Sequence, residues 1–265
     1  MNELEYVRPA SLAEAVKLVA TDPDARFLAG GQTTLPSMRL GLLTPSKLVD
    51  LGAIAELRSI RMAGRQLVIG AMTRHAEVAR SAEVRAKIPA LARLAEAIGD
   101  RQVRNLGTIG GSVANSDPAA DYPAAVLGLG ATVITNDRKI EADGFFTGLF
   151  STALKTGEII TAVSFPVPDQ SAYVKFKQPA SHFALVGVFV ARFGKDVRVA
   201  VTGAGLNAFR VAALEQALAR RFAPEACDGV QVPADRLNTD LHASAAYRAH
   251  LIPLLACRAV QQAIG

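Results

Sequence analysis

A run of small and polar residues between two apolar segments places the strongest limit on how this chain can fold. The run covers residues 105–121, contains the adjacent glycines Gly110 and Gly111, and has only three aliphatic side chains larger than alanine. Such a composition is typical of a loop rather than of a core. Paired glycines allow a positive φ and the close approach of another molecule, so their amides can point together at an anion. We therefore expect a nucleotide-binding loop here.

The polar side chains of this run suit the same purpose. Thr108, Ser112 and Asn115 supply short-range donors, and Asp121 supplies an acceptor suited to sugar hydroxyls. A second run of similar chemistry covers residues 27–34, where an apolar strand ends in a double glycine followed by polar side chains. Either glycine pair alone is more typical of a tight turn. Together they fit a dinucleotide, whose pyrophosphate has two phosphates to hold.

The two motifs resemble those of a known family. Ala-Gly-Gly-Gln-Thr at 29–33 and Thr-Ile-Gly-Gly-Ser at 108–112, with Arg104-Asn105 before the second and Asp121 after it, resemble the FAD-binding medium subunit of molybdenum hydroxylases. That family includes carbon monoxide dehydrogenase and xanthine dehydrogenase. Residues 240–248 resemble the end of the family's C-terminal domain, so the resemblance covers nearly the whole chain.

The resemblance implies an α+β fold in two parts. Residues 1–168 are expected to form a two-lobed FAD-binding domain of the PCMH type, with lobes at about 1–58 and 59–168. Residues 171–265 are expected to form a small C-terminal domain, a three-stranded antiparallel sheet with helices. The residues Pro166, Pro168, Asp169 and Gln170 independently indicate a domain boundary.

The resemblance also implies a set of cofactor contacts. Residues 27–34 and 108–112 would wrap the pyrophosphate, and Asp121 would bond a ribose or ribityl hydroxyl. Ile98 and Ile160 would pack on the cofactor and Lys177 would approach the flavin, although core packing and a plain strand charge explain these three as well. The predicted cofactor-binding residues are Phe27, Leu28, Ala29, Gly30, Gly31, Gln32, Thr33, Thr34, Ile98, Thr108, Ile109, Gly110, Gly111, Ser112, Asn115, Asp121, Ile160 and Lys177.

The function implied by the resemblance is electron transfer through FAD. The chain would accept electrons from the [2Fe–2S] clusters of a small subunit, while molybdopterin would sit on a large subunit, in a dimer of heterotrimers. An external acceptor would receive the electrons. Ala184 stands where NAD-using relatives place an acidic residue, which argues against NAD. Two alternatives stay open: a stand-alone flavin oxidase or reductase, and a nucleotide-binding module without redox activity.

The composition and the motifs of the sequence argue against several other classes of function. The chain has 265 residues and a formal charge of +5, but its Lys and Arg are scattered and aromatics make up 6%, which argues against nucleic acid. Charged residues interrupt every apolar run before membrane-span length, and the acidic start lacks a signal-peptide pattern, so we expect a cytoplasmic protein. Histidines 75, 182, 242 and 250 are read as surface or capping residues, and no catalytic triad or metal motif is expected.

Periodicity predicts several elements around these motifs. Ser11 begins a capping box for a helix to about Ala20, and Thr73 is predicted to be the N-cap of a helix through Ala79. Pro253 is expected to kink or divide the last helix. A rival motif, Gly-Ala-Gly-Leu-Asn-Ala at 203–208, resembles a Rossmann site, but no second parallel strand with an acidic residue follows it.

Overall fold

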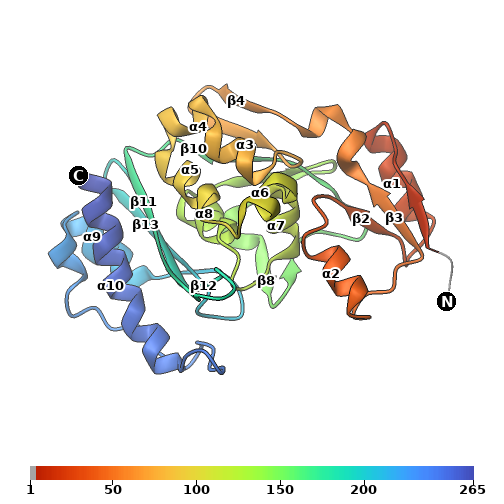
Figure 1. The fold of residues 1–265 in the computed structure, drawn as a ribbon. Helices are drawn as coiled ribbons and strands as arrows, with labels where there is room; N and C mark the ends of the chain where they lie inside the picture. Colours follow the sequence, from red (N-terminus) through yellow and green to blue (C-terminus); the bar gives the residue numbers. More distant parts are fainter. Residues whose placement is uncertain (1–3) are drawn as a thin grey trace.

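The structure, a computed structural model, describes residues 4–265 and begins with a small parallel sheet. Its strand order is β1-β3-β2, and one helix, α1, connects the first two strands of the chain. This lobe lies at one end of the molecule, drawn in red and orange (Figure 1). Its elements are β1 (Glu5–Val7), α1 (Leu12–Ala20), β2 (Arg26–Leu28), α2 (Thr34–Arg39), β3 (Lys47–Asp50), η1 (Leu51–Ala53) and η2 (Ala55–Leu57).

The second lobe is a five-stranded antiparallel sheet covered by short helices. Its strand order is β4-β5-β10-β6-β7, so the last strand of the lobe, β10, runs through the middle of the sheet. The elements are β4 (Ile60–Ala63), β5 (Gln66–Gly70), α3 (His75–Arg80), α4 (Ala82–Lys87), α5 (Pro89–Glu96), α6 (Arg101–Leu106), α7 (Ile109–Asn115), α8 (Tyr122–Gly128), β6 (Thr132–Thr135), β7 (Lys139–Glu141), η3 (Ala142–Gly144), β8 (Phe146–Gly148), β9 (Ser151–Thr152) and β10 (Ile160–Pro166).

A third, antiparallel sheet follows at the other end of the molecule (Figure 1). The predicted three strands are present, and a two-residue fourth strand, β14, extends the order to β11-β12-β13-β14. An all-antiparallel sheet excludes the Rossmann reading of residues 203–208, which needs parallel strands. The elements are β11 (Gln170–Lys177), β12 (Ala184–Phe193), β13 (Asp196–Thr202), β14 (Phe209–Arg210), α9 (Ala212–Arg220), η4 (Pro224–Cys227) and α10 (Ala245–Ile264).

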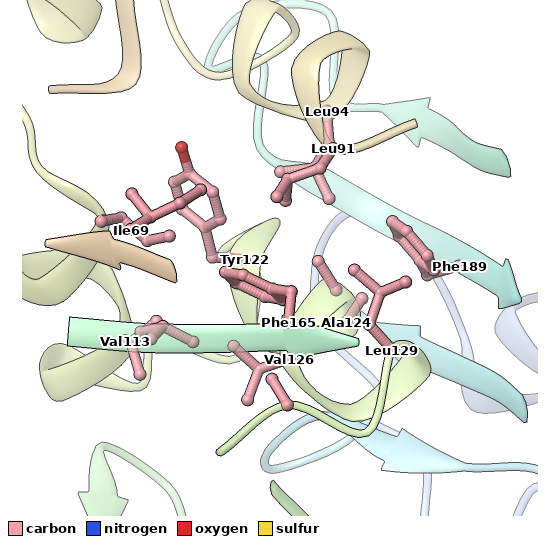
Figure 2. Close-up of a cluster of buried hydrophobic side chains, with 14 of the residues drawn as sticks. Ile69, Leu91, Leu94, Val113, Tyr122, Ala124, Val126, Leu129, Phe165 and Phe189 are labelled. Carbon is pink, nitrogen blue, oxygen red and sulfur yellow. The ribbon is translucent and has the colours of Figure 1, made fainter. Parts of the chain in front are cut away.

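The third sheet is buried on both faces, which explains the unbroken apolar run of β12. Successive side chains of a strand point to opposite faces. Phe189 and Ala191 join the core of the second lobe, whereas Val188 and Val190 join a separate core under α9 and α10. Figure 2 shows Phe189 facing the cluster that contains Tyr122 and Phe165. The C-terminal sheet therefore packs directly on the second lobe.

Two local predictions from the sequence are wrong: residues 109–115 form helix α7 rather than a loop, and the N-cap of α3 is Arg74 rather than Thr73. Pro253 does not divide the last helix, because it lies inside the continuous helix α10, and the kink expected there stays a prediction. Of the cysteines, Cys227 is buried and Cys257 is half-buried, and both are free thiols.

The N-cap at Ser11 is confirmed and allows a stability test, although the return bond of the predicted capping box goes to the amide of Ala10 rather than to that of Ser11. The Ser11 hydroxyl accepts a hydrogen bond from the Glu14 amide, and the Glu14 carboxylate accepts one from the Ala10 amide. Removing an N-cap hydroxyl leaves a helix amide without its partner, so we expect Ser11→Ala to lower the free energy of unfolding by about 1 kcal/mol. Urea unfolding of both proteins measures this loss.

Candidate functional site

A cavity of about 800 Å³ opens between the two lobes and the hairpin that joins β11 to β12. The first lobe contributes residues around 25–34, the second lobe contributes residues around 107–121, and the hairpin contributes Ser181, His182 and Phe183. Ligand pockets usually fall between about 300 and 1,000 Å³, so this one is large enough for a large cofactor. Three separate parts of the chain thus form one site.

The first glycine stretch lies directly against the second one. A Cβ on Gly30 would overlap the carbonyl oxygen of Leu106 and would lie 2.7 Å from the Cα of Gly107. Gly31 has φ +72°, the left-handed conformation that favours glycine. The contact between the backbones at Gly30 and Gly107 brings the two predicted motifs together.

The amides of the first stretch are available to a ligand. Within residues 4–265, the backbone N–H groups of Gly30, Gly31, Gln32 and Thr33 donate no hydrogen bond to the protein. All four residues line the cavity. Consecutive free amides in such a turn form a concave anion-binding nest, and buried or ligand-facing amides need an acceptor. Residues 30–33 therefore present to the cavity the kind of free amides that an anion site requires.

The second stretch differs from the prediction. Gly110 and Gly111 lie in helix α7 without a positive φ, and the Gly110 and Ile109 amides donate to the carbonyls of Ala71 (2.8 Å) and Thr73 (3.1 Å). The expected second nest of free amides is wrong. The glycine at 110 is needed for close packing, because its Cβ would lie 2.8 Å from the Cα of Ala71.

Helix α7 offers side chains to the cavity instead. Thr108, at its N-cap, accepts a hydrogen bond from the Gly111 amide at 3.2 Å, and Ser112 and Asn115 also line the cavity. A Cβ on Gly111 would lie 2.9 Å from the Thr108 hydroxyl and 3.3 Å from the Cβ of Ala29. This wall is closely packed against the first glycine stretch.

Asp121 stands on the cavity wall with both carboxylate oxygens engaged. It is 5% exposed, and the Tyr173 hydroxyl and the Lys175 ammonium donate to it, the latter at 3.0 Å. Burial raises the pKa of the Asp121 carboxyl, while Lys175 and Tyr173 oppose that rise. Lys175 also donates to the carbonyl of Ala97 at 2.9 Å. Tyr173 and Lys175 were not among the predicted site residues.

His75 is a buried cavity residue, so its prediction as a surface or capping residue is wrong. Its side chain lines the cavity beside Gly107, is 5% exposed, and lies 5.3 Å from the Tyr122 ring. Burial, with a smaller contribution from Arg104, lowers the pKa of His75 to about 4. Its Nδ1 has no hydrogen-bond partner among the described residues. The imidazole is therefore neutral at pH 7.

The remaining wall is the turn that leads into β10. Glu158 accepts hydrogen bonds from Thr135, Arg138 and the Lys155 amide, and the Arg138 contact lowers the pKa of Glu158 to about 2. These bonds fix the turn from Lys155 to Ile160, which borders the cavity. Glu158 is thus a structural anchor rather than a free acid.

Most predicted site residues meet at this cavity, and three do not. Leu28 and Ile109 are buried in the protein core, and Lys177 is exposed at the end of β11, outside the cavity lining. The hairpin residues His182 and Phe183 line the cavity as well. The predicted residues that line it are Phe27, Ala29, Gly30, Gly31, Gln32, Thr33, Thr34, Ile98, Thr108, Gly110, Gly111, Ser112, Asn115, Asp121 and Ile160.

Two other kinds of site are not found in residues 4–265. No cluster of three or more His, Cys, Asp or Glu side chains there could hold a metal ion. No helix in that range is both long and apolar enough to cross a membrane.

Comparison with known proteins agrees with the geometry. Residues 2–168 match the family model described as the FAD binding domain in molybdopterin dehydrogenase. The chain is 38% identical over 245 residues to the carbon monoxide dehydrogenase medium chain of Hydrogenophaga pseudoflava, covering 87% of this chain and 84% of that one. It is 31% identical to the glyceraldehyde dehydrogenase medium chain of Sulfolobus acidocaldarius, covering 98% of both.

Solved structures show the same fold. Reconstituted carbon monoxide dehydrogenase from Oligotropha carboxidovorans superposes with a TM-score of 0.89 at 32% identity, covering 98% of this chain and 97% of that one. The chain therefore belongs to the FAD-binding medium-subunit family of the molybdenum hydroxylases, a family of oxidoreductase subunits whose cofactor is FAD.

Proposed function

We propose that the cavity between the glycine stretches is the FAD site. The observation that carries this proposal is the backbone contact of Gly30 with Leu106 and Gly107, which merges two polar stretches far apart in the sequence into one cavity of about 800 Å³. The donor set fits the cofactor, because the free amides of 30–33 suit a pyrophosphate. Apolar residues, among them Ile98 and Ile160, suit a flavin ring.

Each part of the cavity has a role in this proposal. The amides of residues 30–33 bind phosphate oxygens, and the side chains of Thr108 and Ser112 add donors beside them. Asp121 accepts a hydrogen bond from a ribose or ribityl hydroxyl. When bound, FAD supplies the redox chemistry, while the protein supplies binding, orientation and local electrostatics.

We further propose that the chain works as an electron-transfer subunit. Its relatives include medium chains of carbon monoxide dehydrogenase and of glyceraldehyde dehydrogenase, so we infer a complex with a large molybdenum-binding subunit and a small [2Fe–2S] subunit, arranged as a dimer of heterotrimers. Electrons would reach this subunit from the [2Fe–2S] clusters and leave to an external acceptor. We retain the domain limits 1–168 and 171–265 and a cytoplasmic location as parts of this proposal.

Co-purification from the native host tests the assignment. We expect a tagged chain to retain a molybdenum subunit and an Fe–S subunit, to show a flavin absorption spectrum, and to be reduced only when both partners are present. A flavin reduced directly by substrate in the isolated chain would support a stand-alone oxidase or reductase instead. A chain that binds nucleotides but shows no flavin would support a module without redox activity.

Gly111→Val tests the wall formed by helix α7. The added side chain would press on the Thr108 hydroxyl and on Ala29, which lie 2.9 and 3.3 Å from a Cβ at this position. Overpacking of this kind costs about 1–3 kcal/mol, so we expect FAD affinity to fall by about tenfold or more. Titration of the FAD-free chain with FAD, followed by fluorescence quenching, measures the change, and unchanged affinity would contradict the proposed site.

A further inference from the structure

A buried charged cluster joins the C-terminal sheet to the cavity wall. Strand β11 supplies Tyr173 and Lys175, whose hydroxyl and ammonium groups donate to Asp121 in the loop that leads to α8. The side chains of Lys175 and Asp121 are 6% and 5% exposed. Lys175 also reaches the carbonyl of Ala97, just after helix α5. One ammonium group therefore ties three elements together at the edge of the site.

The charge balance of the cavity explains why this ammonium matters. Asp117 and Asp121 both line the cavity, and burial raises the pKa of each carboxyl. An anionic pyrophosphate entering the same cavity adds further negative charge. A buried carboxylate without a counter-ion is costly, and it takes up a proton instead. Lys175 is the cation in direct contact with Asp121.

We propose that Lys175 is a positioning residue for FAD: it holds the Asp121 carboxylate oriented and charge-compensated, so that cofactor binding needs no proton uptake. This inference rests on the proposed FAD site. It also makes cofactor affinity depend on the C-terminal sheet, because Lys175 belongs to that sheet. The resemblance indicated Lys177 as the flavin-side lysine, but Lys177 is exposed and lies outside the cavity lining.

The other titratable groups around Asp121 do not replace Lys175. Tyr173 donates a neutral hydrogen bond, and burial raises its pKa well above the usual value. Tyr122, next in the chain on α8, also has a pKa raised by burial, and it carries no charge at neutral pH. His75, packed against Tyr122, is neutral at pH 7, and Asp117 is a like charge. Without Lys175, no cation among residues 4–265 is in contact with the carboxylate.

The experiment measures FAD affinity from pH 6 to pH 9 in the full chain. For Lys175→Met we expect about tenfold weaker binding at pH 8, with affinity falling by up to about tenfold for each further pH unit. Above the pKa of Asp121 in the FAD-free variant, the carboxylate must take up a proton for FAD to bind. The wild type lacks this additional dependence. The double variant Lys175→Met with Asp121→Asn loses this pH dependence. Lys195 is an exposed lysine in the turn between β12 and β13, and Lys195→Met behaves like the wild type.

Three outcomes overturn the inference: unchanged affinity in Lys175→Met, a loss of equal size at every pH, or a pH dependence that survives Asp121→Asn. Lys175→Gln, which keeps a donor but removes the charge, provides the same test if the methionine variant does not fold. A wild-type chain that binds no FAD would instead overturn the proposed function. Flavin binding by the wild type with no change in the variants would overturn only the role of Lys175.

Discussion

Gly30→Ala is expected to lower the affinity for FAD by about 100-fold, which corresponds to about 2.7 kcal/mol. The single added methyl group would overlap the carbonyl oxygen of Leu106 and press on the Cα of Gly107 at 2.7 Å. Both neighbours are backbone atoms, so no side chain can rotate away to relieve the overlap. The two glycine stretches must move apart, and the free amides of residues 30–33 lose their position relative to Thr108 and Ser112.

Gly144→Ala is the matched control for this variant. Gly144 has no positive φ, and a Cβ there meets no atom of residues 4–265 within 4 Å. FAD titration of the purified wild type, Gly30→Ala and Gly144→Ala proteins gives the affinities, and circular dichroism checks that each is folded. A folded Gly30→Ala protein with wild-type affinity would show that contact between the two stretches does not define the cofactor site.

The sequence allowed the two glycine stretches to be paired, but it did not reveal how each one works. At residues 30–33 the expected turn with a positive φ is present at Gly31. At Gly110 the same dipeptide is helical, although glycine is a poor helix former. Packing against Ala71 decides this conformation, and Ala71 is about 40 residues away in the chain. Local propensity contains no information about such a contact.

Lys175 shows a second limit of structure prediction from sequence patterns. Tyr173, Lys175 and Lys177 alternate along β11 and would share one face of a regular strand. The pairing of β11 with β12 shifts register between Phe176 and Lys177, so the alternation does not continue to the strand end. Lys175 is buried on Asp121, whereas Lys177 is exposed. A bulge of this kind has no clear signature in a single sequence.

The C-terminal sheet was predicted more completely than the site. The three expected strands, β11, β12 and β13, are all present, and each is long enough to show a strand pattern of its own. The two-residue strand β14 is too short to produce a periodic signal. The burial of both faces of β12 could not be read from its sequence either, because an unbroken apolar run is compatible with a buried helix segment as well.

Below pH 6.5 the buried imidazole of His75 is expected to destabilise the protein by up to about 3 kcal/mol. Burial lowers its pKa to about 4 from 6.5, so in this range the unfolded chain binds a proton that the folded chain does not. The stabilising contribution is complete above pH 6.5, decreases as the pH falls towards 4, and is level below that. A shift of about 2.5 pKa units corresponds to about 3 kcal/mol.

His75→Gln removes the titrating group. Between pH 7 and pH 4 the free energy of unfolding of this variant, measured with urea, should therefore fall by about 3 kcal/mol less than that of the wild type. The difference between the two proteins isolates His75, because the raised pKa of Asp121 and the lowered pKa of Glu158 contribute equally to both. His250→Gln, an exposed histidine of α10, should follow the wild type. Parallel curves for wild type and His75→Gln would mean that the imidazole is protonated in the folded state. The cavity wall beside Gly107 would then carry a positive charge in this pH range, which contradicts a neutral His75 imidazole.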